Sequence, residues 1–261
     1  MTALLDVQEV TRTYRSGGVD HVAVDSVSFS VAAGKTIAIV GESGAGKSTL
    51  ARMITGLESP TSGSVLVGGR PPVIRRGKPS EVQMVFQHPL DALNPLRSIG
   101  ASIASPLHGV QAAERRRRVA ESMAAVGLDP DRAGQRPRAF SGGQLQRVVI
   151  ARALAADPRL LLCDEPTSSL DVSVQAQIVN LLLALQEEHR FGCVLVTHDL
   201  AVARVLADEI LVLRAGRTVE HRSADEFFGG PIAEYSRALL AAHAHEAGGE
   251  DAERTMVEPR T

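Results

Sequence analysis

The chain has 261 residues, 44% of them hydrophobic and 22% charged, which is ordinary for one large globular domain or for a core with a subdomain. Its net charge of −2 provides no general field for binding nucleic acid, and we expect no nucleic-acid partner. No apolar run approaches the ~20 residues that a membrane-spanning helix needs, so we expect any membrane contact to come from a partner chain.

Two features of the sequence favour a reducing compartment. The first residues, MTALLD, lack the basic and then apolar segments of an export signal. Cys163 and Cys193 lie in apolar runs, where unpaired core cysteines are more usual than a disulfide or a metal pair. We therefore predict a cytoplasmic protein.

The first third of the chain has the pattern of strands followed by a strand–loop–helix unit. Alternating apolar residues predict strands around 4–10 and 22–31, with a Ser-Gly-Gly turn between them. The apolar run 36–40 predicts a buried strand that leads through a glycine-rich loop into a helix at 47–55. Residues 82–86 are typical of another buried strand.

From about residue 89 to 156 the chain changes character, because prolines come first and helix formers then predict a helix at 114–126. Beyond this block, apolar strands are predicted at 160–163, 193–196 and 209–213. A helix between the first two has one buried face, formed by Val174, Ile178, Leu181, Leu182 and Leu185. The alternation predicts a mostly parallel sheet with helices on both faces.

A phosphate-binding motif follows the strand at 36–40. Gly41-Glu-Ser-Gly-Ala-Gly-Lys47-Ser48-Thr49 fits the P-loop pattern G-x-x-x-x-G-K-[ST], and the strand before it and the helix after it argue against a chance match. Backbone N–H groups of such a loop point at phosphates, the lysine reaches the β- and γ-phosphates, and the next hydroxyl can ligate Mg²⁺. The residues expected to bind nucleotide are Gly41, Glu42, Ser43, Gly44, Ala45, Gly46, Lys47, Ser48 and Thr49.

An apolar strand that ends in two carboxylates, Leu160-Leu-Leu-Cys-Asp164-Glu165, supplies a second half of the site. Asp164 would lie at the carboxyl edge of the sheet, where it can hold Mg²⁺ directly or through water. Glu165 can orient and deprotonate an attacking water. Alone, such a segment is better explained as a strand that ends in a charged turn; the upstream P-loop favours the metal site.

Ser141-Gly-Gly-Gln-Leu-Gln-Arg147 precedes the apolar helical run 148–156 and creates a second helix N-terminus with free N–H groups. A turn with a helix cap would explain this segment if it stood alone. With Phe140 before it, the segment closely resembles the signature of the ABC ATPases, which often has leucine first. The chain is identified as a member of the ABC ATPase family, and the resemblance covers nearly the whole chain.

The remaining motifs of that family occur in order. Tyr14, between the first two strands, matches the aromatic residue that stacks on adenine; a tyrosine in a surface turn is the alternative. Gln87 matches the Q-loop glutamine that contacts Mg²⁺ and water and couples to the membrane subunit. Asp171, in Ser-Ser-Leu-Asp, matches the D-loop that crosses to the partner cassette. His198 matches the switch histidine that touches the γ-phosphate, although a lone histidine at a strand end is usually structural.

The resemblance implies an α/β fold: a P-loop NTPase (RecA-like) core with a mixed sheet, an N-terminal antiparallel β-subdomain and an inserted helical subdomain. We expect residues 1–88 and 157–225 to form the α/β core with the β-subdomain, and residues 89–156 to form the helical signature subdomain. Residues 226–261 would be a C-terminal extension, with a flexible polar tail from about residue 248.

The resemblance also implies that ATP and Mg²⁺ bind between two cassettes, where the signature of one chain completes the P-loop site of the other. ATP would join the pair and hydrolysis would release it. The residues expected to act in hydrolysis are Glu165, His198, Gln87 and Lys47. The signature and D-loop residues expected at the nucleotide are Ser141, Gly142, Gly143, Gln144 and Asp171. The expected metal ligands are Ser48, Gln87 and Asp164.

Two segments resemble the cassettes of dipeptide, oligopeptide and nickel importers. One is Gln87-His-Pro-Leu-Asp-Ala-Leu-Asn-Pro95, with His88 where that group usually has aspartate. The other is the C-terminal segment 227–240. The alternative explanations are a proline-bounded loop for the first segment and a packing helix for the second. Some members of the group have a cysteine cluster near that extension, which could hold an iron–sulfur site. This chain has no such cluster, so an iron–sulfur site is not supported.

Membership of that group implies several partners. It implies a peripheral subunit on the cytoplasmic face of the inner membrane, paired with a second and different cassette and with two transmembrane permease subunits. An extracytoplasmic substrate-binding protein would act indirectly. The cargo, peptide or nickel, is set by those other chains.

Other functions are less well supported. Arg115–Arg118 is a basic run, but the adjacent Glu114 and Glu121 and the lack of aromatic neighbours favour a solvated helix face. An ABC ATPase that acts on DNA would have a long coiled coil between P-loop and signature, and one that acts on the ribosome would carry two cassettes in tandem. The signature argues against a P-loop kinase or GTPase.

Overall fold

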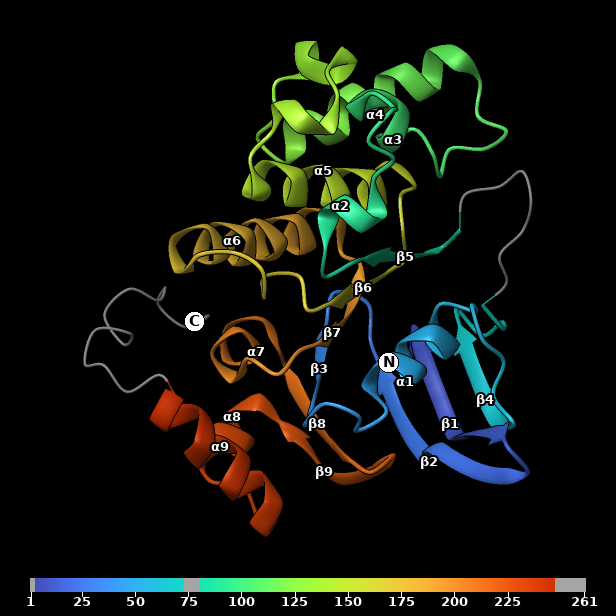
Figure 1. Ribbon diagram of the computed structural model, residues 1–261, viewed down its shortest axis with the longest axis vertical. Helices are drawn as coiled ribbons and strands as arrows, with labels where there is room; N and C mark the ends of the chain where they lie inside the picture. Colours follow the sequence, from blue (N-terminus) through green and yellow to red (C-terminus); the bar gives the residue numbers. More distant parts are fainter. Residues whose placement is uncertain (1–2, 73–79, 247–261) are drawn as a thin grey trace.

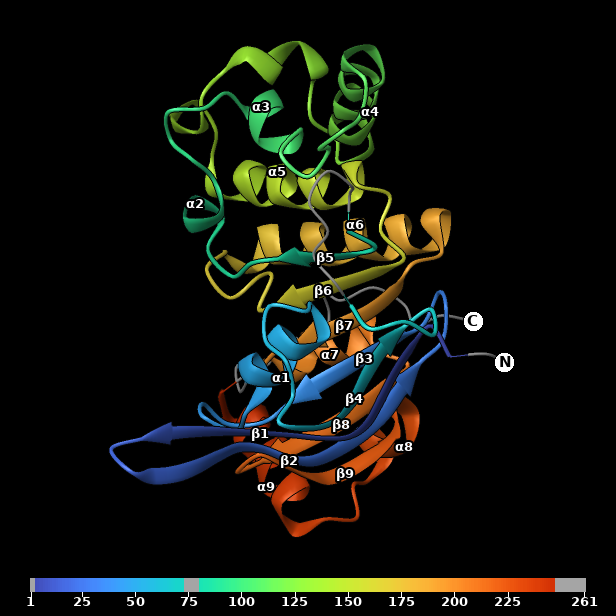
Figure 2. The same ribbon diagram turned by 90° about the vertical axis from the view of Figure 1, so that its right-hand side faces the viewer.

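The computed structural model describes residues 3–72 and 80–246 (Figure 1). The polar tail predicted from about residue 248 lies outside these ranges. Across the described ranges, no helix combines the length and the apolar character that crossing a bilayer requires. A central sheet carries helices on both faces, and a smaller sheet stands beside it (Figures 1 and 2).

The central sheet has the strand order β5-β6-β7-β3-β8-β9. Its neighbours pair in parallel except β9, which returns antiparallel to β8. The bounds are β3 Thr36–Val40, β5 Val82–Val85, β6 Leu160–Asp164, β7 Gly192–Val196, β8 Glu209–Arg214 and β9 Arg217–Ser223. The predicted mixed α/β core is therefore confirmed.

Two apolar clusters hold the layers together, one on each face of the central sheet. Side chains alternate along β3, so Ala38 and Val40 join the cluster under the longer helices while Ile37 and Ile39 join the cluster under α1 and the small sheet. The helices that follow sheet strands are α1 Lys47–Ile54, α6 Val172–His189 and α7 Leu200–Leu206. Each strand that precedes one of these helices is thus held by apolar packing on both faces of the sheet.

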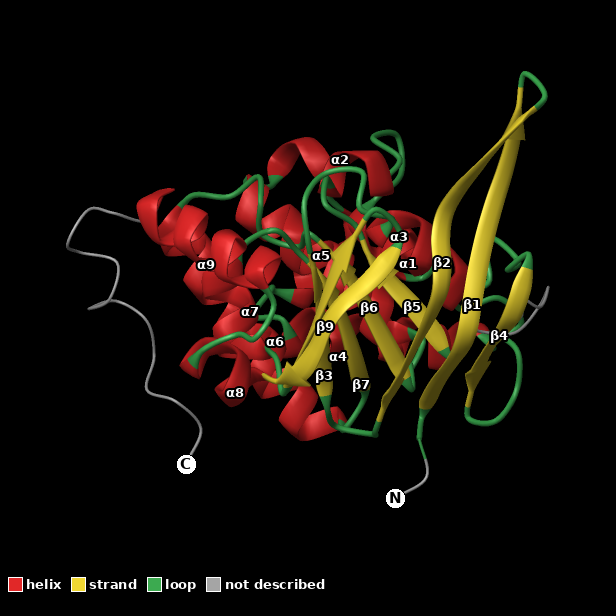
Figure 3. Cartoon of the chain, turned by 90° about the horizontal axis from the view of Figure 1, so that it is seen from below, coloured by secondary structure: helices red, strands yellow, loops and turns green. Residues whose placement is uncertain are grey.

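The small antiparallel sheet has the order β2-β1-β4, with β1 Leu5–Ser16, β2 Val19–Val31 and β4 Ser62–Val67. The strands predicted at 4–10 and 22–31 are too short. Gly17 and Gly18 have φ angles of 60° and 82°, which suit a two-residue hairpin turn, so the pairing continues to the last residue before the turn. The resulting hairpin projects well beyond the rest of the molecule (Figure 3).

A helical block occupies one end of the molecule, at the top of Figure 1. It comprises α2 Pro89–Ala92, α3 Ile99–Ile103, α4 Ala112–Ala125 and α5 Gly142–Ala155, with 3₁₀ helices at Pro130–Gly134 and Pro137–Ala139. The basic run lies on α4, where Arg117 pairs with Glu114 at 2.8 Å and with Glu121 at 2.6 Å. The predicted solvated helix face is confirmed, and the structure adds these ion pairs.

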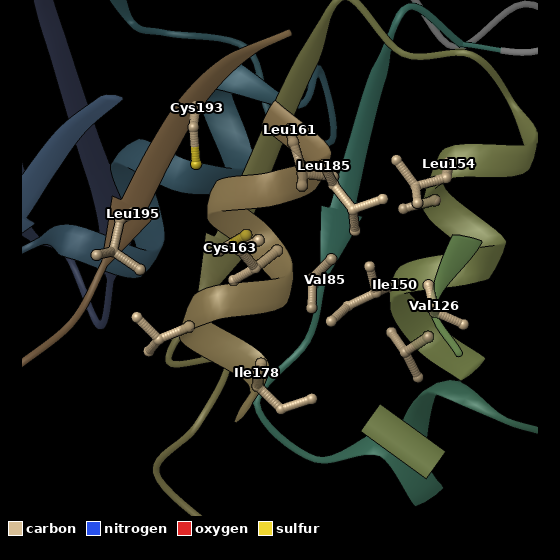
Figure 4. Packing of buried hydrophobic residues seen from close by; sticks show 14 of the residues in the cluster. Val85, Val126, Ile150, Leu154, Leu161, Cys163, Ile178, Leu185, Cys193 and Leu195 are labelled. Atoms are coloured by element: carbon tan, nitrogen blue, oxygen red, sulfur yellow. The ribbon is translucent and has the colours of Figure 1, made fainter. Parts of the chain in front are cut away.

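The two cysteines are buried and unpaired, as predicted. Figure 4 shows Cys163 on β6 and Cys193 on β7 among the apolar side chains beneath α6. A hydrogen bond to Cys193 and burial raise the pKa of the Cys163 thiol. The pair therefore behaves as small core residues.

The chain ends, within the described residues, in α8 Ala224–Gly229 and α9 Glu234–Glu246. Both lie at lower left in Figure 1, beside α7 and β9. Phe227 of α8 is fully buried, and Leu239 and Leu240 of α9 pack against the larger apolar cluster. The last helix is thus attached to the same face of the sheet as α7.

Candidate nucleotide-binding site

The loop between β3 and α1 has backbone geometry that only glycine accommodates at two positions. A Cβ at Gly41 would lie 2.2 Å from the backbone oxygen of Leu213, and φ there is +151°. A Cβ at Gly46 would lie 2.4 Å from the backbone oxygen of Ala23, and φ there is +101°. The loop therefore packs its own backbone closely against neighbouring strands and begins α1 with its N–H groups free.

Lys47 is the first residue of α1 and is only 8% exposed. Its Nζ donates to the backbone oxygens of Gly41 at 2.6 Å and of Glu42 at 2.9 Å. Burial lowers the pKa of Lys47, and the nearby carboxylates of Glu165 and Asp164 oppose that effect. The loop thus holds a desolvated cation close to two acidic groups.

The two carboxylates stand where β6 ends. Burial and the adjacent charge of Glu165 raise the pKa of Asp164, which Lys47 partly opposes. Glu165 has a left-handed φ of 47°, and its N–H donates to the backbone oxygen of Val196 in β7 at 2.8 Å. A non-glycine residue in this region costs energy, so its backbone is held here by the neighbouring strand.

Glu165 is the centre of a small hydrogen-bonded network. Its Oε2 accepts from Nε2 of Gln87 at 2.8 Å, and its Oε1 lies 3.0 Å from Nδ1 of His198, which donates in the tautomer with Nδ1 protonated. Gln87 Nε2 also donates to Oγ of Ser168 at 3.1 Å. Gln87 and His198, which were predicted from separate motifs, therefore both contact the carboxylate of Glu165, which was predicted from a third motif.

The strand order explains why these residues meet. Gln87 follows β5, Glu165 follows β6, His198 follows β7 and Lys47 follows β3, and these four strands are consecutive and parallel in the sheet. The carboxyl ends of parallel strands share one edge, which is where open α/β sheets bind ligands. The other P-loop residues predicted to bind nucleotide, from 42 to 49, lie in the same loop and the first turn of α1.

The signature segment forms a helix cap. The Ser141 hydroxyl accepts from N–H of Gln144 at 3.4 Å, and Oε1 of Gln144 accepts from N–H of Ser141 at 3.1 Å, which is a capping box at the start of α5. A Cβ at Gly143 would lie 2.5 Å from Cγ1 of Val174, whereas one at Gly142 would meet nothing closer than 3.9 Å. Gly143 therefore lets α5 approach the first turn of α6.

The D-loop residue Asp171 caps α6. Its carboxylate accepts from N–H of Val174 at 2.9 Å and from the hydroxyl of Ser173 at 2.7 Å, and these bonds lower its pKa. Among residues 3–72 and 80–246, the hydrogen bonds of the signature and D-loop side chains do not extend to the P-loop. The signature and D-loop adjoin each other through Val174, and Ser168 of the D-loop accepts from Gln87.

The prediction placed Tyr14 between the first two strands, but it lies within β1. The pairing of β1 with β2 continues past Tyr14 to the glycine turn. Its hydroxyl donates to Oε2 of Glu58. The guanidinium of Arg12 lies 4.8 Å from the ring centroid and within 3.4 Å of the same Glu58 carboxylate. The ring is therefore half-buried and fixed by its edge and by one face.

Asp199, which sequence reasoning missed, caps α7 directly after His198. Its Oδ1 accepts from N–H of Ala201 at 2.8 Å and of Val202 at 3.1 Å, and its Oδ2 accepts from Nε2 of Gln175 at 2.6 Å. The aspartate ahead of an apolar helical run is a recognisable N-cap signal in the sequence. The bond to Gln175 links α7 to the D-loop helix.

Two residues of α9 that sequence reasoning also missed reach the edges of the site. The hydroxyl of Tyr235 accepts from N–H of Glu42 at 3.4 Å, and Nε2 of His243 accepts from N–H of Ala201 at 3.2 Å. These contacts join segments 193 and 42 residues apart. No local pattern signals such pairs, because only the folded position of α9 creates them.

Two chemical requirements of triphosphate hydrolysis meet at this edge of the sheet: a backbone cradle with a lysine, and a carboxylate able to accept a proton from water. They define a P-loop nucleoside triphosphatase. The chain matches the model of the family described as ABC transporter over residues 24–168. It belongs to the ABC transporter family and is an ATP-binding ATPase of the ABC type.

Two named relatives are similar to this chain along most of its length. The Di/tripeptide transport ATP-binding protein DppF of Pseudomonas aeruginosa (strain UCBPP-PA14) is 44% identical over 256 residues, which are 93% of this chain and 79% of that protein. The Oligopeptide transport ATP-binding protein OppF of Escherichia coli (strain K12) is 46% identical over 230 residues, 84% of this chain and 69% of that protein.

Solved structures show the same fold. A dimeric post-hydrolysis state of the ATP-binding cassette MJ0796 bound to ADP and Pi has a TM-score of 0.73 and 33% identity, covering 84% of this chain and 98% of that one. The structure of cbiO1 from Clostridium perfringens, part of the ABC transporter complex cbiONQ, has a TM-score of 0.78 and 25% identity, covering 97% of each chain.

Proposed function

We propose that the chain is the ATP-binding subunit of a peptide importer and couples hydrolysis of MgATP, at an interface between two cassettes, to transport through partner membrane subunits. The observation that carries the hydrolytic part is the Glu165 carboxylate held by both Gln87 and His198. A carboxylate positioned by two neighbours can orient a water for attack on the γ-phosphate and take its proton. Lys47 would stabilise the phosphate charge.

The donors at the sheet edge fit a magnesium ion. Ser48, Asp164 and Gln87 offer hydroxyl, carboxylate and amide oxygens, which are hard ligands of the kind that Mg²⁺ prefers. No group of three His, Cys, Asp or Glu suited to a metal occurs in the described part of the chain, so the remaining ligands would be water and phosphate oxygens. When bound, Mg²⁺ neutralises charge that develops on the phosphates.

The separation of the motifs supports a composite arrangement. Among the described residues the hydrogen bonds of the signature and D-loop side chains do not reach the P-loop, so the N–H groups at the start of α5 would serve the P-loop of a second cassette. Residues Ser141, Gly142, Gly143, Gln144 and Asp171 would complete that opposite site. We propose a different cassette as the partner, as in the peptide importers that the sequence resembles.

The Q-loop segment offers a surface for a membrane subunit. Phe86, Leu90 and Leu96 are 38%, 62% and 76% exposed around α2, an apolar group beside the site. Arg152 of α5 lies 5.7 Å from the ring centroid of Phe86 and donates to the backbone oxygen of Ala92. A permease seated there could move α5 and Gln87 together, which would couple transport to hydrolysis.

The same proposal assigns the chain a location in the cell and a role to each part of the sequence. It places the subunit on the cytoplasmic face of the inner membrane, held by two permease subunits and served indirectly by a binding protein. Residues 1–88 and 157–225 would act as the nucleotide-binding core, 89–156 as the signature subdomain and 226–261 as an extension. The names of the similar proteins favour peptides over nickel.

Transport is tested in cells that lack their own peptide importers. The chain, a second cassette, the permeases and the binding protein encoded with them should restore uptake of a radiolabelled tripeptide, and the Glu165→Gln variant should not. Uptake of radioactive nickel in place of peptide would overturn the cargo assignment. Hydrolysis stimulated by DNA or ribosomes, with no transport, would favour the alternative of a non-transport ABC ATPase.

Tyr14→Ala is expected to weaken ATP binding, because the open face of the Tyr14 ring is proposed to stack on adenine. Base–aromatic stacking contributes about 1–3 kcal/mol, which corresponds to roughly 5- to 150-fold in Kd. Tyr14→Phe keeps the ring and loses only the bond to Glu58, so its effect should be small. His21→Ala, opposite Tyr14 on β2, is the matched control. Calorimetric titration with ATP decides; an unchanged Kd for Tyr14→Ala would exclude the stacking role.

A further inference from the structure

The segment that leads into helix α9 is anchored by a buried carboxylate. Glu220 of β9 is 8% exposed, and its oxygens accept from N–H of Ile232 at 2.9 Å and of Ala233 at 3.1 Å. Burial raises the pKa of Glu220, but the nearby Ser236, these two bonds and the charge of Arg222 together outweigh it and lower the pKa. A charged carboxylate at a helix N-terminus is favourable, so the start of α9 is fixed relative to β9.

One face of this anchored helix carries Tyr235, Leu239 and His243, spaced four residues apart. Leu239 packs against the large apolar cluster. The two polar residues of the face extend to either side of that contact, separated by about 12 Å along the helix at 1.5 Å per residue. The face can therefore touch two different loops at once.

Tyr235 touches the P-loop from outside. Its hydroxyl accepts from N–H of Glu42 at 3.4 Å, and the guanidinium of Arg214, on β8, lies 4.6 Å from its ring centroid. The backbone oxygens of Gly41 and Glu42 both accept from Nζ of Lys47. Tyr235 thus bonds the N–H of the Gly41–Glu42 peptide group, whose oxygen accepts from Nζ of Lys47 at 2.6 Å.

His243 touches the segment that carries the switch histidine. Its Nε2 accepts from N–H of Ala201 at 3.2 Å and lies 3.6 Å from Oδ1 of Asp199. Asp199 follows His198 directly and receives the hydrogen bond from Gln175 of the D-loop helix. His243 thus supports the turn that aims His198 at Glu165.

We propose that Tyr235 and His243 are positioning residues, and that α9 is a strut that fixes the start of the P-loop relative to the switch-histidine turn. Hydrolysis needs the phosphates, held by the P-loop, to keep a set distance from Glu165 and His198, and small displacements are costly. The strut rests on the proposed role of these residues at the nucleotide. It assigns a catalytic purpose to a C-terminal extension that carries no nucleotide motif.

The test compares four variants of the full chain assembled with its transporter partners. Tyr235→Phe and His243→Leu remove the two acceptors, His243→Gln restores an acceptor oxygen, and Ala242→Gln changes an exposed neighbour on the same helix. Loss of one positioning hydrogen bond should lower kcat about three- to tenfold while KM for ATP stays near its original value. Ala242→Gln should match the parent, and His243→Gln should recover most of the kcat lost in His243→Leu.

Thermal unfolding separates positioning from folding. If a variant is less stable, kcat is compared at a temperature well below the unfolding midpoint of every variant. A kcat of His243→Gln well above that of His243→Leu at that temperature still supports a positioning role for His243. Unchanged kcat in Tyr235→Phe and His243→Leu overturns the strut, as does a parallel loss of ATP binding. The proposed role of Glu165 in hydrolysis is tested separately from the strut. It would be contradicted if the Glu165→Gln variant hydrolysed ATP as fast as the parent.

Discussion

Glu165→Gln is expected to lower the rate of ATP hydrolysis by about 10²- to 10⁴-fold, the range for loss of a positioned general base. Glutamine keeps the shape of the side chain but cannot accept the proton of the attacking water. One of its two terminal atoms also becomes a donor, so it cannot accept from both Gln87 and His198. ATP affinity should change little, because the P-loop and Lys47 are untouched.

The consequence for assembly is equally specific. If ATP joins the two cassettes and hydrolysis releases them, the Glu165→Gln chain and its partner cassette should elute as a stable dimer in the presence of ATP, and as monomers without it. Glu188→Gln, an exposed carboxylate on α6, is the matched control and should cycle normally. A persistent monomer with every candidate partner cassette supplied would contradict the composite site.

The residues of the proposed catalytic centre were predictable because local patterns place them. Lys47, Glu165 and His198 each follow a short apolar run, and parallel strands bring their carboxyl ends to one edge whatever the order of strands. The sequence did not indicate that β3 would lie between β7 and β8, since strand order depends on long-range pairing. It nonetheless predicted residues that the structure brings together, because any order of parallel strands leaves their carboxyl ends at the same edge.

The edges of the site were less predictable. Tyr14 matches a family motif by its place in the chain, but its segment was expected to lie between two strands, because the polar residues between 11 and 21 hide a hairpin that projects into solvent. The environment of the ring depends on Glu58, 44 residues away. Tyr235 and His243 gave no signal at all, since their partners are backbone N–H groups, which every sequence contains.

The signature glycines show how a motif can serve packing and chemistry together. At Gly142 a Cβ would find ordinary contact distance, whereas at Gly143 it would lie 2.5 Å from a methyl group of Val174, which is branched at Cβ and cannot swing far aside. Gly143 is thus required for the contact between α5 and the D-loop helix. That contact is one of those that place the N-terminus of α5.

Gly143→Ala should therefore displace the start of α5 and lower hydrolysis about 10²-fold, as misplacement by ~1 Å can do, while ATP binding to the isolated chain stays intact. Gly142→Ala should cause a much smaller loss. The informative variant is Gly143→Ala combined with Val174→Ala, which removes the clashing methyl and should recover most of the rate. Single-turnover hydrolysis with the partner cassette measures all three. If the double variant hydrolyses ATP no faster than Gly143→Ala, the clash with Val174 is not the cause, and the signature is not positioned through the D-loop helix.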